Sequence, residues 1–67
     1  MEITGILTEW HMLPDRRIYA KIVVDYKKRF QKGMFMTTSE IREIQFTGIY
    51  SKGVRFARTK NSIYILV

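Results

Sequence analysis

The sequence predicts a small all-β domain in which five or six antiparallel strands form a barrel or a strongly bent sheet. Three observations lead to this prediction. Hydrophobic and polar residues alternate with a period of two, β-branched and aromatic residues dominate the alternating segments, and short turn signals separate them. With 67 residues and no cysteine, the chain is expected to form one domain, residues 1–67, whose small core gives it marginal stability.

The first two expected strands flank a turn at residues 13–16, where Pro14 presets the backbone angle. Residues 3–10 form a mixed β-branched and aromatic run that fits the first strand. The second strand begins near residue 18 and alternates strictly, which is typical of a half-buried strand. Alternation assigns one face to Ile18, Ala20, Ile22 and Val24, and the other face to Tyr19, Lys21, Val23 and Asp25.

A basic stretch at residues 26–33 ends at Gly33 and is expected to be a loop. Residues 34–38 then fit a short third strand, and residues 42–50 a fourth. Thr37 and Glu40 have the spacing of a capping box, so one short helical turn near residues 39–43 is an alternative for the segment between these strands.

The last two strands are expected around turns at residues 51–53 and 60–61. Gly53 is assigned to the first of these turns as a residue with a positive backbone angle. In the strand that follows, Val54 and Phe56 are expected to face the core and Arg55 the solvent. Residues 62–67 close the fold and should pair with the first strand or with a second copy of the chain. Because small sheets rarely leave two bare edges, a barrel of SH3-like or OB-like type is expected.

The charge of the chain is high and unevenly distributed. Twelve lysines and arginines against six acidic residues give a formal net charge of +6. Residues 1–15 hold three of the acids and no base, whereas residues 16–67 hold all twelve bases and the other three acids. Two stretches, residues 26–33 and 52–60, place aromatic rings among the cations. Such a composition can pair with phosphates and stack on bases.

We therefore expect cations from separate loops to meet on one basic surface that binds nucleic acid, single strands included, with little sequence specificity. Counterion release would supply affinity, and Tyr19 and Tyr26 would stack on bases. The simpler interpretation is a solvated face whose charge only maintains solubility. The residues expected at the surface are Tyr19, Lys21, Tyr26, Lys27, Lys28, Arg29, Lys32, Lys52, Arg55, Arg58 and Lys60.

A protein-interaction or inhibitor module is the second hypothesis. A compact domain with exposed strand edges could add a strand to a partner or to itself as a homodimer, or bind an acidic protein surface. By analogy, small proteins of mobile elements often cap a larger host enzyme. The marginal size of the chain favours burial against another chain.

Enzymatic, metal and cofactor chemistry is not expected. His11 is the only histidine, and Glu9 two positions away should share its strand face, but no nucleophile or second ligand accompanies them. No glycine-rich phosphate loop is present. Trp10 should lie opposite Leu7 by alternation, yet its size favours a place in the core over an exposed anchor. A soluble, cytoplasmic protein without a membrane partner is expected, because no leader and no long apolar run occur.

Overall fold

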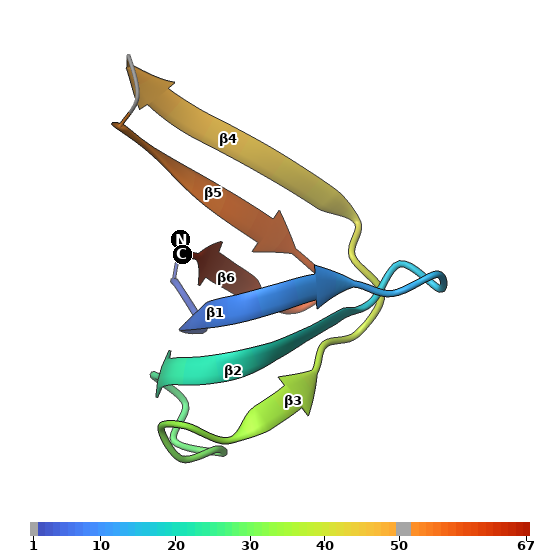
Figure 1. The fold of residues 1–67 in the computed structure, drawn as a ribbon, viewed down its shortest axis with the longest axis vertical. Helices are drawn as coiled ribbons and strands as arrows, with labels where there is room; N and C mark the ends of the chain where they lie inside the picture. Colours follow the sequence, from blue (N-terminus) through green and yellow to red (C-terminus); the bar gives the residue numbers. More distant parts are fainter. Residues whose placement is uncertain (1, 50–51) are drawn as a thin grey trace.

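The structure, a computed structural model, describes residues 2–49 and 52–67 and consists of one sheet in which six strands follow the order β3-β2-β1-β6-β5-β4 (Figure 1). The predicted all-β class and the predicted strand segments are confirmed, with ends that differ by one or two residues. The strands are β1 (Gly5–Met12), β2 (Ile18–Asp25), β3 (Phe35–Thr37), β4 (Glu43–Ile49), β5 (Lys52–Arg58) and β6 (Ile63–Leu66).

The sheet is bent and open, and it is mixed. β6 pairs with β1, as expected for the last strand, but this pair is parallel, while the other four pairs are antiparallel. β3 and β4 are the two edges, so the sheet does not close into a barrel. The connection from β3 to β4 bonds to both halves of the molecule, since Ile41 N–H donates to Arg16 O at 2.6 Å and Arg42 N–H donates to Arg58 O at 2.7 Å.

The core lies on the inner face of the bent sheet. Side chains from five strands and from the β3–β4 connection meet there, and Trp10 and Phe30 pack against their margin. β6 occupies the middle of the sheet, between β1 and β5, and contributes two buried side chains. The buried hydrophobic residues are Leu7, Ile18, Ala20, Ile22, Met36, Ile41, Ala57, Tyr64 and Leu66.

Two bulges change which side chains face the core. In the β1–β2 pair, Ile6 opposes Val24 but Leu7 opposes Ile22, which leaves Val23 as an extra residue. A second shift separates the Thr8 and His11 pairs, where Glu9 has a φ of 50°. A bulge reverses the facing of the residues beyond it. Asp25 is therefore buried, and the prediction that it lies on the outer face is wrong.

The second bulge has the same effect on Trp10. Trp10 packs against the core on the side of Leu7, so the expected opposition of these two residues is wrong and the expected core position of Trp10 is correct. The same bulge interrupts the regular alternation from which Glu9 and His11 were expected to share one face of the strand. The Glu9 carboxylate accepts a hydrogen bond from Lys21 Nζ at 2.9 Å, and His11 is exposed.

The facing of β5 is the reverse of the prediction. Ala57 is buried, whereas Val54 is exposed and Phe56 half-buried, so Val54 and Phe56 do not form the core side. Arg55 is exposed as expected, but it lies on the inner face with Ala57. The reason is that the small Ala57 fits the crowded centre of the bent sheet, while Arg55 lies nearer the open end and stacks on aromatic rings there.

The expected turns are partly confirmed. Residues 14–16 and 60–61 form bends, and Gly33 has a φ of 89° at the end of the basic loop. Gly53 instead belongs to β5 opposite Gly48, without a positive φ, so its predicted role is wrong. Ser51 and Tyr50 lie outside the described residues. Residues 38–42 form an irregular connection, and no helical turn occurs there. None of the elements in the two described ranges is a helix long and apolar enough to cross a membrane.

Candidate nucleic-acid interface

The basic loop, residues 26–33, is folded around the buried carboxylate of Asp25. One oxygen accepts a hydrogen bond from Lys27 N–H at 3.1 Å, and the other accepts from Arg29 N–H at 2.9 Å and Phe30 N–H at 3.0 Å. Lys28, between these donors, has a φ of 57°, a left-handed conformation that the loop holds in place. With its backbone tied to Asp25, the loop directs its lysine side chains outward, where Lys27 and Lys28 are exposed.

The environment of Asp25 favours its charged form. Burial alone would raise the pKa of this carboxyl, but the backbone N–H donors of Lys27, Phe30 and Arg29, with the Arg29 guanidinium, together hold the pKa below its ordinary value. Arg29 Nε lies 3.5 Å from the carboxylate, and the aspartate side chain is only 2% exposed. One negative charge is thus enclosed beneath the loop, and the exposed lysines remain unpaired with it.

Thr4 joins the basic loop to the second basic segment, the turn at residues 58–62. Its carbonyl accepts a hydrogen bond from Tyr26 N–H at 2.9 Å, and its N–H donates to Ile63 O at 2.7 Å. Its side-chain oxygen accepts a third bond, from Ile63 N–H at 3.1 Å. Residues some thirty positions apart in the sequence are therefore side by side at one end of the sheet. We call this region, residues 26–33 with 58–62, the basic end.

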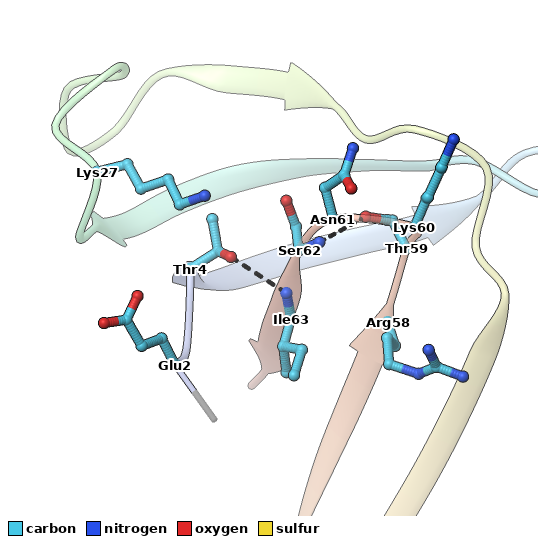
Figure 2. Close-up of a pocket in the computed structure, with 9 residues that line it drawn as sticks. All are labelled: Glu2, Thr4, Lys27, Arg58, Thr59, Lys60, Asn61, Ser62 and Ile63. Carbon is cyan, nitrogen blue, oxygen red and sulfur yellow. Dashed lines mark hydrogen bonds between the residues drawn. The ribbon is translucent and has the colours of Figure 1, made fainter.

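A hollow of about 420 Å³ lies at this basic end (Figure 2). Lys27 extends into it from the loop, toward Ser62, and Arg58 and Lys60 project from the opposite rim. Its remaining lining is polar apart from Ile63: Glu2, Thr4, Thr59, Asn61 and Ser62. Thr59 Oγ1 accepts a hydrogen bond from Ser62 N–H at 3.1 Å, which fixes the shape of the turn. Thr4 and Thr59 are buried, so the hollow offers an anionic ligand the ammonium groups of Lys27 and Lys60 and the hydroxyl of Ser62.

A second hollow of about 570 Å³ lies along the basic loop itself. Lys28, Arg29 and Lys32 line it together with residues 23–25 at the end of β2. Tyr26 is 57% exposed at the start of the same loop. Six of the predicted cations therefore lie at the basic end, three lining each of the two hollows.

The two predicted residues of β2 lie elsewhere. Tyr19 and Lys21 share the outer face of β2, as expected, but they line neither of the two hollows. The Tyr19 ring stacks on Phe35 of β3 with centroids 5.2 Å apart, and Lys21 Nζ lies 5.9 Å from the centroid of Phe35. They form a separate aromatic patch with Phe35, a residue that was not among those predicted for the basic surface.

Arg55 is also separate from the basic end. Its guanidinium lies near two rings, 5.3 Å from the centroid of Trp10 and 5.7 Å from that of Phe46. This cluster is on the inner face, at the open side of the sheet. Lys52 begins β5, but its side chain lies outside the described residues.

Ion pairs neutralise some of the predicted cations. Lys21 pairs with Glu9 at 2.9 Å, Arg58 with Glu43 at 3.2 Å, and Arg29 with Asp25. Within residues 2–49 and 52–67, no ion pair involves the lysines at positions 27, 28, 32 and 60. These four lysines carry the uncompensated charge of the basic end.

Sequence reasoning missed the polar residues that shape the hollow. Thr4, Thr59 and Ser62 organise it through hydrogen bonds, two of which link residues 59 positions apart in the sequence. Nothing in the local sequence marks Thr4 for this role. In the described part of the chain, no group of three histidine, aspartate or glutamate side chains could hold a metal ion.

Comparison with known proteins gives no relative for this chain. No protein-family model, no curated protein and no solved structure matches it.

Proposed function

We propose that the protein binds the phosphate backbone of single-stranded nucleic acid at its basic end, with little sequence specificity. The observation that carries the proposal is the hydrogen bonding of Thr4 to both Tyr26 and Ile63, which brings two basic segments to one hollow. A polyanion laid along this end would meet the ammonium groups of four lysines without competing acids bound to them.

The chemistry of the hollow suits phosphate more than base edges. Lysine ammonium groups act as mobile point charges, and the side-chain amide of Asn61 and the hydroxyl of Ser62 can donate to phosphate oxygens. The exposed ring of Tyr26 lies next to Lys27 in the chain and can stack on an unpaired base. A single strand provides such bases, whereas a duplex keeps them stacked inside.

The salt dependence of binding tests the proposal. We expect the affinity for a fluorescent single-stranded oligonucleotide, measured by anisotropy, to fall linearly on a log–log plot against salt concentration. Each phosphate contact contributes about 0.7 to that slope for single strands. The double variant Lys27→Gln/Lys60→Gln should therefore lower the slope by about 1.4 and weaken binding at low salt.

The matched control removes two cations at the other end of β1. Arg16→Gln/Arg17→Gln changes the net charge by the same amount at the exposed β1–β2 hairpin. This control should bind more tightly than the Lys27→Gln/Lys60→Gln variant. Equal losses in the two variants would show that only net charge matters, and an absence of binding at low salt would rule the proposal out.

A further inference from the structure

The outer edge of β4 is a long unpaired strand edge. β4 pairs with β5 in an unbroken register of seven residue pairs, from Glu43–Arg58 to Ile49–Lys52. It is the terminal strand of the sheet, and Figure 1 shows no other described element alongside its outer edge. About half of its backbone N–H and C=O groups point away from β5. Those groups are available to another strand.

β4 lacks the features by which monomeric proteins protect such an edge. Edge strands are normally short, bulged, or interrupted by lysine or proline. β3, the opposite edge, is only three residues long. β4 has seven residues, contains neither lysine nor proline, and has no register shift in its pairing. Its regular backbone favours the addition of a strand.

Apolar side chains accompany this edge. Phe46 is 60% exposed and Ile44 is 41% exposed, both on the face that β4 shares with the core. The Phe46 ring lies over Gly53, where a Cβ atom would come within 3 Å of it, and the Arg55 guanidinium lies 5.7 Å from its centroid. The edge therefore presents an exposed aromatic ring and an aliphatic side chain to whatever pairs with it.

We propose that two copies of this chain pair antiparallel along β4, so that their sheets join into one. The register that pairs all seven residues has its twofold axis at Phe46. It sets Gln45 opposite the partner's Thr47, and Ile44 opposite the partner's Gly48, where the small glycine leaves room. A twofold, self-complementary contact of this kind closes after two subunits.

The charges of β4 suit a second copy. Residues 44–49 are all neutral, although the chain as a whole carries +6. Glu43, the single charged residue of the strand, is already bound to Arg58 and would oppose the partner's Ile49. No like charges therefore face each other across the pairing, which would otherwise oppose the association of two basic molecules.

Variants at the exposed positions 45 and 47 test the dimer. In nuclease-treated protein without oligonucleotide, analytical ultracentrifugation should show a concentration-dependent dimer for the wild type. Gln45→Lys/Thr47→Lys sets lysine opposite lysine twice, and we expect its dimer dissociation constant to rise by about tenfold or more. Gln45→Lys/Thr47→Glu sets lysine opposite glutamate in the same register and should remain dimeric.

A distal control separates the edge from net charge. Thr37→Lys/Ser39→Lys adds the same two charges at exposed positions near β3 and should dimerise like the wild type. A wild type that stays monomeric, a double-lysine β4 variant that still dimerises, a dissociated lysine–glutamate variant, or a distal control that dissociates equally would each overturn the proposal.

Hydrogen exchange on the wild type covers the case in which a β4 variant does not fold. Amides of residues 43–49 should exchange more slowly at high than at low protein concentration, and unchanged exchange would contradict the dimer. Because these experiments contain no nucleic acid, their outcome is independent of the proposed binding function.

Discussion

Asp25 is the residue on which the shape of the basic loop most depends. Its carboxylate accepts three backbone hydrogen bonds within five residues of its own position and carries an ion pair with Arg29. Buried N–H groups that lose their acceptor are costly, because they cannot turn to water. The positions of the loop lysines 27, 28 and 32 therefore depend on one buried acid.

The substitution Asp25→Asn tests this role through its pH dependence. At neutral pH, we expect the free energy of unfolding to fall by about 1–3 kcal/mol, because asparagine offers one acceptor oxygen in place of two. The pKa of Asp25 is lower in the folded protein than in the unfolded chain, where it is near 4. The carboxylate thus stabilises the fold above that value, and this contribution is lost as the pH falls through the folded pKa. The difference between wild type and variant, measured by urea unfolding, should shrink on acidification.

Asp15→Asn provides the control for this experiment. Asp15 is an exposed aspartate of the β1–β2 hairpin that pairs with Arg17 at 3.3 Å. Its replacement should change the free energy of unfolding by no more than about 0.5 kcal/mol. Equal losses in the two variants, or an Asp25→Asn difference that stays constant with pH, would contradict the role of Asp25.

At the residue scale, the sequence predicts which side chains are exposed better than it predicts which residues they contact. The loop cations Lys27, Lys28 and Lys32 were expected to be exposed, and they are. Asp25 was placed on the outer face because alternation was extended through Val23. The bulge at Val23 depends on the pairing with β1, and no feature of the β2 sequence alone announces it.

At the scale of elements, strand positions could be predicted because their causes are local. Alternation, β-branched content and turn residues located every strand to within one or two residues. The facing of β5 could not be predicted in this way. The alternation of hydrophobicity in residues 54–57 predicts that Val54 and Phe56 face the core. The inner face is too crowded near Tyr64 for a large side chain, so the small Ala57 occupies it instead.

The last strand is expected to be essential, since β6 links the two halves of the sheet. Deletion of residues 65–67 removes the buried Leu66 and the pairings of β6 with Ile6 and Leu7 of β1 and with Arg55 and Phe56 of β5. We expect this truncated chain to be unfolded, because β1 and β5 then lose the strand between them. Circular dichroism with thermal melting measures the effect.

Deletion of Val67 alone is the matched control. This side chain is 65% exposed, and deletion of the residue removes two hydrogen bonds, from Val67 N–H to Leu7 O and from the exposed Thr8 hydroxyl to Val67 O. The melting midpoint should fall by no more than about 5 °C. A cooperative transition near the wild-type midpoint in the longer deletion would show that β6 is dispensable.

At the scale of the whole molecule, the charge separation along the sequence does not persist in space. Two of the three acids of residues 1–15 bind bases from later in the chain, Glu9 with Lys21 and Asp15 with Arg17. The acids are thereby removed from the basic end, apart from Glu2 at the rim of the hollow. These two acids neutralise bases elsewhere in the fold. The lysines of the basic end remain without an ion pair among the described residues, and this distribution depends on the fold and not on the order of charges in the sequence.

The grouping of the candidate site could be anticipated only in part. Composition identified the two basic segments that meet at the basic end. It also assigned Tyr19, Lys21 and Arg55 to the same surface, whereas they lie in two other aromatic clusters. The parallel pairing of β1 with β6 determines which loops meet, and a contact between the first and last strands leaves no local signature in the sequence.

Both basic segments should contact one polyanion, and NMR chemical-shift mapping would show whether they do. We expect titration of ¹⁵N-labelled protein with a short single-stranded oligonucleotide to shift the amide signals of residues 26–33 and 58–62 together, with one shared saturation curve. Shifts confined to one segment, or centred on the Tyr19–Phe35 patch or the Arg55 cluster, would show that the two segments do not form one binding surface.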